Sequence, residues 1–104
     1  MLTPSYSRQF ERDLKLMLKR GKDAEKLKLV IASLVDEEPL AERYRDHPLV
    51  GNYRGRRECH IEPDWLLIYS LLADAIIFER TGSHSDLFNG GCWQIAVGTG
   101  DRSR

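Results

Sequence analysis

The strongest constraint on the fold is the stretch 56–81, in which three short apolar segments follow one another with very little chain between them. The candidate strands are RRECHI (56–61), WLLIYSLL (65–72) and AIIFERT (75–81). Pro63 suits the second position of a turn between the first two, and an Ala-Asp turn links the last two. Strands spaced this closely pair antiparallel. The sequence therefore predicts an antiparallel meander.

Two amphipathic helices are predicted ahead of the meander. Ser5 or Ser7 can cap the first, Gly21 ends it, and Asp23 can cap the second. The first helix repeats apolar residues at helical spacing, at Phe10, Leu14, Met17 and Leu18. The second does the same at Leu27, Val30, Ile31, Leu34 and Val35, until Pro39 stops it. These segments predict a helical hairpin.

The middle strand, 65–72, is apolar on both faces, so helices are expected to cover one face of the sheet while the other stays partly open. Residues 40–55 carry Pro48, Gly51 and Gly55 and are expected to form an irregular connection. The predicted fold class is α+β, an N-terminal helical hairpin packed on a small, mainly antiparallel β-sheet.

The chain of 104 residues fits one domain, expected over 1–88. The segment 89–104 has four glycines in sixteen residues and is expected to be a loosely ordered extension. No apolar run or basic leader suggests a membrane span or signal peptide, so a cytoplasmic location without membrane contact is expected. Cys59 and Cys92 are too few for a disulfide framework or zinc site, and we expect no metal and no cofactor.

The charged residues are unevenly distributed although the net charge is zero. A neutral chain is unusual for a nucleic-acid-binding protein. The stretch 43–57, however, holds Arg43, Arg45, Arg54, Arg56 and Arg57 against one acid, Asp46. Such a stretch would either contact phosphates or form a solvated surface with scattered ion pairs, and composition leaves both readings open.

Polar residues with catalytic chemistry occur at the ends of the predicted strands. His60 ends the first strand, Asp64 and Trp65 start the second, Arg80 ends the third, and His84 follows in a loop. Because consecutive strands of a meander run in opposite directions, these positions meet at one edge of the sheet. His47 lies in the basic connection.

Such a group suits metal-independent cleavage of an RNA phosphodiester. Two histidines would divide the roles of base and acid, attacking through the 2′-hydroxyl and protonating the leaving oxygen. An aspartate would orient a histidine, and an arginine would offset phosphate charge. Trp65, Tyr53 or Phe88 would stack on bases. Each residue also has a plain structural explanation, as a packing histidine, a turn aspartate, a surface ion pair or a core aromatic.

Three blocks, DHPL with a following glycine, HIEPDWLLIY and FERTGSHSDLF, resemble the YafQ branch of the RelE/ParE toxin superfamily. The resemblance runs from the first helix to Phe88 and implies a RelE-like fold. It also implies a ribosome-dependent endoribonuclease, an mRNA interferase toxin of a type II toxin-antitoxin system. The family's functional positions fall on His47, His60, Asp64, Trp65, Arg80, His84 and Phe88.

The resemblance implies roles and partners as well. His47, His60, Asp64, Arg80 and His84 would be catalytic, with the assignment of base and acid open. Trp65, Phe88, Arg54, Arg56, Lys15 and Lys19 would bind or position RNA. A cognate antitoxin, expected to be of the ribbon-helix-helix type, would block the site and supply any contact with operator DNA. The ribosome and its mRNA would be the other partners.

Two other functions remain open at this stage. One is a non-catalytic, protein-binding toxin like the gyrase-inhibiting members of the superfamily, which would not need the histidines. The other is a decayed or purely regulatory homologue that binds only antitoxin and operator DNA.

Overall fold

The structure is a computed structural model that describes residues 1–88. The predicted extension, 89–104, lies outside these residues. The helices are α1 (Arg8–Lys19), α2 (Ala24–Val35) and the short α3 (His84–Phe88). The strands are β1 (Thr3–Tyr6), β2 (His47–Pro48), β3 (Arg57–Glu62), β4 (Trp65–Leu71) and β5 (Ala75–Gly82). Two 3₁₀ turns, η1 (Glu42–Tyr44) and η2 (Gly51–Tyr53), lie in the connection from α2 to β3.

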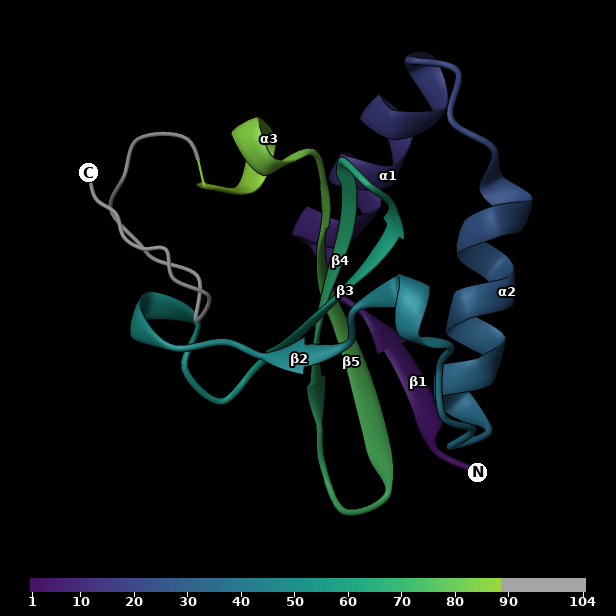
Figure 1. Cartoon of the computed structure of the whole chain (residues 1–104), viewed down its shortest axis with the longest axis vertical. Coiled ribbons are helices and arrows are strands. Elements are labelled where there is room, and N and C mark those ends of the chain that lie inside the picture. Colours follow the sequence, from purple (N-terminus) through teal and green to yellow (C-terminus); the bar gives the residue numbers. More distant parts are fainter. Residues whose placement is uncertain (89–104) are drawn as a thin grey trace.

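The sheet has the strand order β1-β5-β4-β3-β2 (Figure 1). The predicted meander is confirmed, because β3, β4 and β5 pair antiparallel in chain order. Two strands were not predicted: β2 pairs antiparallel with β3, and β1 pairs in parallel with β5. All four β1 residues are exposed and include Pro4, so the segment has no apolar alternation to reveal a strand.

The helix boundaries follow the predicted caps. Ser7 Oγ accepts a hydrogen bond from the Phe10 backbone N–H at 2.9 Å, and Asp23 Oδ1 accepts one from Glu25 at 2.9 Å. Gly21 has φ +89°, a left-handed conformation in which glycine carries no side-chain clash. Leu18 differs from its prediction, because it is 44% exposed rather than on the buried face of α1.

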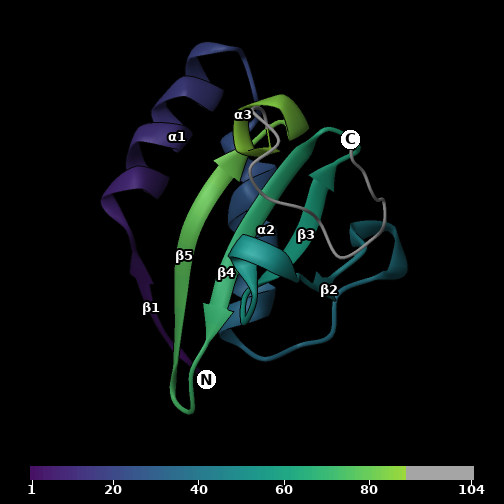
Figure 2. The same ribbon diagram turned by 90° about the vertical axis from the view of Figure 1, so that its left-hand side faces the viewer.

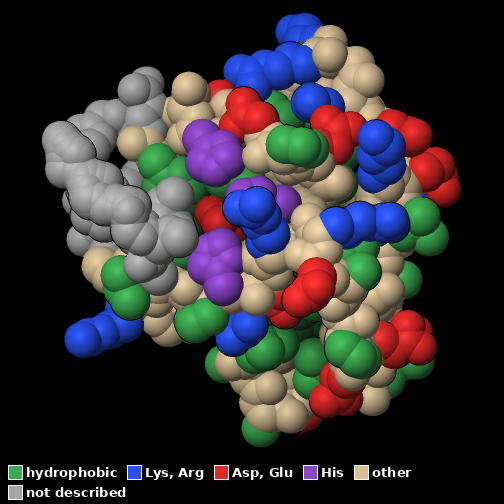
Figure 3. Space-filling model, in the orientation of Figure 1, with side chains coloured by type: hydrophobic (Ala, Val, Ile, Leu, Met, Phe, Trp, Pro, Cys, Tyr) green, Lys and Arg blue, Asp and Glu red, His purple; other side chains and the backbone are tan. Residues whose placement is uncertain are grey.

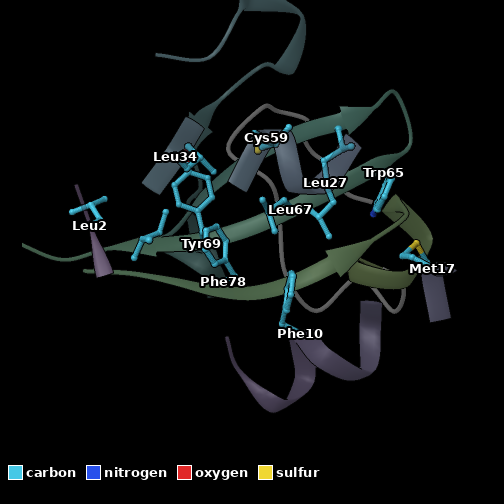
Figure 4. Packing of buried hydrophobic residues seen from close by; sticks show 13 residues of the cluster. Leu2, Phe10, Met17, Leu27, Leu34, Cys59, Trp65, Leu67, Tyr69 and Phe78 are labelled. Carbon is cyan, nitrogen blue, oxygen red and sulfur yellow. The ribbon is translucent and has the colours of Figure 1, made fainter. Parts of the chain in front are cut away.

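Helices α1 and α2 cover one face of the sheet (Figure 2). The main core lies between these helices and the sheet. It includes Phe10 and Met17 of α1, Leu27 of α2, and Leu67 and Phe78 of the sheet (Figure 4). Alternation along β4 sends every second side chain into this core. The predicted α+β class, with a helical hairpin on a mainly antiparallel sheet, is confirmed.

The opposite face of the sheet carries a second, smaller cluster. Leu66 and Ile68 of β4 point to this face and pack with Leu49, Tyr53 and Leu87. The cover thus comes from the connection before β3 and from α3 rather than from a long helix. Residues 84–88 were predicted as a loop but form helix α3, whose single turn is too short for a helical period to show.

Candidate active site

Helix α3 places His84 through a capping box at its first turn. The Ser83 backbone N–H donates to Asp86 Oδ2 at 2.9 Å, and the Asp86 N–H donates to Ser83 Oγ at 3.1 Å. This reciprocal pattern fixes the start of a helix. Arg20, which follows α1, also holds Asp86, through hydrogen bonds of 2.7 and 3.1 Å. His84, at the first position of α3, is therefore anchored to the end of α1.

The glycine before this turn permits the close approach of α3 to β5. A Cβ on Gly82 would lie 2.9 Å from the Cβ of Asp86 and 3.1 Å from its Oδ2. Real Cβ atoms do not come so close to other atoms, so any larger residue would displace the turn. Gly82, the glycine in FERTGSHSDLF, therefore allows α3 to hold His84 in its position.

Asp64, in the turn between β3 and β4, holds His84 from the other side. Its Oδ1 accepts the His84 backbone N–H at 2.8 Å and lies 2.6 Å from Nδ1 of the ring. These hydrogen bonds, first from the backbone and then from the ring, lower the pKa of Asp64, so the carboxylate stays ionised. One carboxylate oxygen thus sets both the backbone and the ring of His84.

The other two histidines meet at a buried carboxylate. Glu58 is 1% exposed, and its Oε1 lies 3.2 Å from Nε2 of His60 and 3.2 Å from Nε2 of His47. Nδ1 of His47 lies 2.6 Å from the carbonyl oxygen of Arg45. Cross-strand register explains the meeting, since His47 pairs with Glu58 and His60 follows two residues later on the same face.

The three histidines form a continuous group on the face of the sheet that α1 and α2 leave open. Ring centroids are 6.2 Å apart for His47 and His60 and 5.7 Å apart for His60 and His84. Figure 3 shows histidine side chains close together on one face, with basic and acidic side chains among them. Exposure of the side chain rises from 14% at His60 to 27% at His47 and 44% at His84.

Burial and neighbouring charge oppose protonation of the central histidine. Burial is the main cause that lowers the pKa of His60, followed by the charges of His84, His47 and Arg45. Burial likewise raises the pKa of Glu58, although His47 and His84 act against this shift. Opposite shifts on an acid and a base in contact allow one proton to be shared between them at modest cost.

Arg80 lies across the second cluster from the histidines. Arg80 pairs with Ile68, and Ile68 pairs with Glu58. Arg80 therefore lies two strands away from Glu58, a total of about 10 Å. Its guanidinium donates to Asp13 of α1 at 2.7 and 3.3 Å. The hydrogen bond to Asp13 is the first cause that raises the pKa of Arg80, and Tyr53 contributes as well.

The predicted site residues are therefore only partly assembled. His47, His60, Asp64 and His84 lie together, whereas Arg80 stands apart on the same face. The burial of Trp65 contradicts the prediction that its ring stacks on a base. Trp65 is 0% exposed, its indole N–H donates to Thr81 Oγ1 at 2.9 Å, and it lies in the main core under α1 and α2.

The remaining predicted RNA contacts lie on other parts of the molecule. Phe88 is half-buried, with its ring edge-on to Tyr53 at 5.8 Å. Lys15 and Lys19 are exposed on α1 and Arg54 is exposed after η2, while Arg56 donates to Glu79 at 2.6 Å. Their contact with RNA stays a prediction.

Sequence reasoning missed two carboxylates of this region, Glu58 and Asp13. Glu58 shares one strand face with His60 at a spacing of two, and this spacing was a usable signal. Asp13 is 8% exposed and lies three residues after Phe10 and four before Met17, on the apolar side of α1. A carboxylate at such a position needs partners, and Arg80 and the Thr81 N–H supply them.

The arrangement suits proton transfer next to a bound anion. His84 is fixed through Nδ1, which leaves Nε2 to exchange a proton. His60 lies edge-on to His84, and Arg80 offers a permanent positive charge on the same face. Within 1–88, no group of three or more His, Cys, Asp or Glu residues is arranged to hold a metal ion. None of the helices described there has the length and apolarity to cross a membrane.

Comparison with known proteins shows the family of this chain. A family model described as "Bacterial toxin of type II toxin-antitoxin system, YafQ" matches residues 2–89. The Escherichia coli K12 protein named mRNA interferase toxin YafQ is 49% identical over 84 residues, which are 80% of this chain and 91% of the relative.

Solved structures of Escherichia coli proteins match as well. The crystal structure of the E. coli DinJ-YafQ complex contains a chain with TM-score 0.80 and 46% identity, over 86% of this chain and 100% of that one. YafQ from strain BL21(DE3) has TM-score 0.82 and 44% identity, with the same coverage of 86% and 100%. The chain therefore belongs to the YafQ family of bacterial toxins of type II toxin-antitoxin systems.

Proposed function

We propose that this toxin is an mRNA interferase, an endoribonuclease that cleaves message during translation at the ribosome. The observation that carries the proposal is the fixed contact between Asp64 and His84, 2.6 Å long, with the ring of His60 5.7 Å from that of His84. Two adjacent imidazoles with different hydrogen-bond partners and different burial suit acid–base cleavage through a 2′-hydroxyl.

His60 would act as the base and His84 as the acid. Burial keeps His60 neutral near pH 7, so it can accept the proton of the attacking 2′-hydroxyl, with Glu58 beside it to share that proton. Ionised Asp64 would stabilise the imidazolium of His84, which would donate from Nε2 to the leaving 5′ oxygen.

The phosphate would lie between the histidines and Arg80. The guanidinium of Arg80 is held by Asp13 through two hydrogen bonds, which fix its direction before substrate arrives. A pre-oriented cation stabilises charge on the phosphorane-like transition state without reorganising at that moment. His47 would hold its neighbours in place, since it contacts Glu58 and the Arg45 carbonyl.

The partners follow from the same proposal. The related YafQ chain was crystallised in complex with DinJ, and this toxin would bind a cognate antitoxin of its own. We expect that antitoxin to be of the ribbon-helix-helix type and to supply the contact with operator DNA. Ribosomes and translated message would be the targets, which places the protein in the cytoplasm.

Expression in a bacterial host tests the proposal. The unchanged chain should arrest growth and leave cleaved message, and His84→Ala should abolish both effects. Accumulation of DNA breaks with intact message would instead indicate a gyrase-directed toxin, and neither growth arrest nor cleavage would indicate a purely regulatory homologue. Ser85→Ala, at an exposed position on the same short helix, is the matched control and should remain toxic.

A further inference from the structure

A groove runs beside the histidines on the side away from Arg80. It encloses about 860 Å³ between α2, η1 and the end of β3, and His60 and His84 form part of its lining. Its far wall carries Arg43, Tyr44 and Arg45. Binding sites for small ligands span about 300–1,000 Å³, so the groove has room for a nucleotide. Arg43 and Tyr44 have no part in the site described so far, and Arg45 enters it only through its carbonyl oxygen and its charge.

Arg43 and Tyr44 form a layered pair at this wall. The guanidinium carbon of Arg43 lies 4.9 Å from the centre of the Tyr44 ring, and its Nη2 donates to the Tyr44 hydroxyl at 3.0 Å. Tyr44 also packs against the main core, which anchors the ring from behind. Arg43 is exposed and presents a flat, supported cation. Bases of single-stranded RNA stack on arginine planes of this kind.

Arg45 stands between this pair and the histidines. Its backbone is left-handed, with φ 48° and ψ 48°, which is uncommon for a residue other than glycine, asparagine or aspartate. Its carbonyl oxygen contacts Nδ1 of His47, and its exposed side chain lines the groove. The strained backbone is thus held in place by a histidine of the active site.

The balance of charge in the groove favours an anion. The acid in its lining, Glu62, is already paired with Lys22 and Lys26 at 2.8 Å each. Arg43 and Arg45 have no acidic partner among the ion pairs of the described residues. Leu29, 67% exposed, adds an apolar surface to the same lining. An aromatic-backed cation, a second cation and an apolar wall suit a nucleotide better than a protein segment.

We infer that this groove is a binding subsite for the nucleotide next to the scissile phosphate, with Arg43 on Tyr44 as the platform for its base and Arg45 as the ligand of its phosphate. The inference rests on the proposed function and extends it. The RNA strand would run from this groove, past His60 and His84, toward Arg80. The base preference of the toxin at that position would then be set by residues 43–45.

Binding of RNA that lacks the nucleophile tests the subsite without cleavage. Fluorescently labelled 2′-O-methyl hexanucleotides of each base are titrated with the full chain, and the tightest is remade with an abasic residue at each position. Arg43→Ala should weaken binding of the intact oligonucleotide roughly 5- to 150-fold, the range of base stacking, and should have little further effect on one abasic variant. Arg43→Lys keeps the charge but loses the plane, so it should resemble Arg43→Ala.

Arg45→Asn tests the phosphate contact, because asparagine tolerates the left-handed backbone. It should weaken every oligonucleotide of the series alike and reduce the salt dependence of binding. Arg8→Ala, an exposed arginine of α1, is the matched control and should bind as the unchanged chain does.

Three results would overturn the subsite. The first is that no hexanucleotide binds measurably. The second is that Arg43→Ala weakens binding of every abasic oligonucleotide by the same factor. The third is that the arginine variants bind RNA as the unchanged chain does but bind the antitoxin more weakly. The last would make the groove a protein contact. A chain that binds as expected but cleaves no translated message would refute the proposed function and leave the subsite intact.

Discussion

At the scale of single residues, the histidines differ in their carboxylate partner and in the ring nitrogen that meets it. Asp64 takes Nδ1 of His84, whereas Glu58 meets Nε2 of both His47 and His60. Exposure differs as well, with His60 the most buried of the three and His84 the most exposed. Three residues of one type thus acquire different partners and different access to substrate, and acid–base catalysis can use this difference.

The contact between Asp64 and His84 leads to a first prediction. Asp64→Asn keeps an oxygen for the His84 backbone N–H but removes the charge that stabilises an imidazolium. Cleavage of translated message should fall roughly 100-fold, while the far-UV circular dichroism stays unchanged. Asp74→Asn, the same change at an exposed position between β4 and β5, should cleave normally. Equal rates for Asp64→Asn and the unchanged chain would refute the role of Asp64.

The low pKa of His60 leads to a second prediction. As the base it must be neutral, and burial first, then neighbouring charge, lowers its pKa. At a given pH the neutral fraction of His60 is therefore larger than that of an unperturbed histidine. The acidic limb of the cleavage rate should accordingly lie at lower pH than an unperturbed histidine would give. Arg45→Asn removes one of the charges that lower this pKa, so the limb should move to higher pH. A limb that moves the opposite way would exclude His60 as the base.

Residue types were predictable from the sequence, but their partners were not. His60, Asp64 and His84 were expected in one place and lie there, because the meander fixes their strand ends. Arg80 was expected with them but lies two strands away on the same face, and His47, expected only in the basic connection, joins the group through β2. Trp65 was wrong as a stacking platform, since the position that starts β4 points into the core. Whether a strand residue faces the core or the open side changes with a single step of register, which spacing alone does not reveal.

At the scale of elements, the short helix α3 is the part on which the active site depends most. It is joined to β5 by Gly82, to α1 by the ion pair of Asp86 with Arg20, and to the turn before β4 by Asp64. Three separate segments therefore converge on a five-residue helix. Its stability comes from these contacts, since one isolated turn is unstable in water.

Gly82→Ala tests the fit between α3 and β5. The added Cβ would lie 2.9 Å from Asp86, so the turn must shift and carry His84 with it. A shift of about 1 Å costs up to about 100-fold in rate, and overpacking costs about 1–3 kcal/mol of stability. Kinetics of message cleavage and thermal unfolding measure the two effects. Ser85→Ala, exposed on the same helix, should change neither. A fully active Gly82→Ala chain would show that catalysis does not depend on the close approach of α3 to β5.

Asp86→Asn tests the cap of α3 through the pH dependence of stability. The hydrogen bond from Arg20 lowers the pKa of Asp86 to about 2. A lowered carboxyl pKa adds stability that is fully present above the unfolded-state value near 4 and is lost as the pH falls through about 2. The variant should lose about 1 kcal/mol at pH 7, as other cap losses do, and less at pH 3.

Arg20→Gln is the matched variant for this test. It breaks the ion pair but keeps the hydrogen bonds between Ser83 and Asp86, so its loss at pH 7 should be smaller. Thermal unfolding at pH 7 and pH 3 measures both variants. If the stability lost in Asp86→Asn were greater at pH 3 than at pH 7, the ion pair between Asp86 and Arg20 would be contradicted.

The elements themselves were predictable to different degrees. The two long helices and the three strands of the meander have periodic apolar residues, and their predicted bounds hold within about two residues, the usual uncertainty of such ends. Strands β1 and β2 and helix α3 escaped prediction. β1 and β2 are held mainly by backbone pairing and α3 by caps, which leave no apolar period in the sequence.

At the scale of the whole molecule, the sheet separates two functions. The face covered by α1 and α2 holds the main core, and the open face holds the histidines and Arg80, while the groove lies at the β3 side of the sheet between α2 and the histidines. This division lets a chain of zero net charge present a local basic surface. Substitutions on the open face should therefore affect activity more than folding.

The domain boundary gives a further prediction at this scale. The residues that the structure describes end at Phe88, whose ring contacts Tyr53, and the family match ends at residue 89. A chain of residues 1–89 should unfold at nearly the same temperature as the full chain and should cleave message at the same rate. Truncation to 1–87 removes the Phe88 contact and should lower the unfolding temperature. A large loss of stability in 1–89 would show that 89–104 belongs to the domain.

Under the proposed function, the histidines and Asp64 cleave translated message. The direct measurement is a reconstituted translation reaction, in which primer extension maps the ends of a reporter message after the purified toxin is added. The unchanged chain should produce cuts only when the message is translated, and the variant carrying His60→Ala, Asp64→Ala and His84→Ala should produce none while unfolding cooperatively. Cuts of equal intensity with that triple variant would contradict the account.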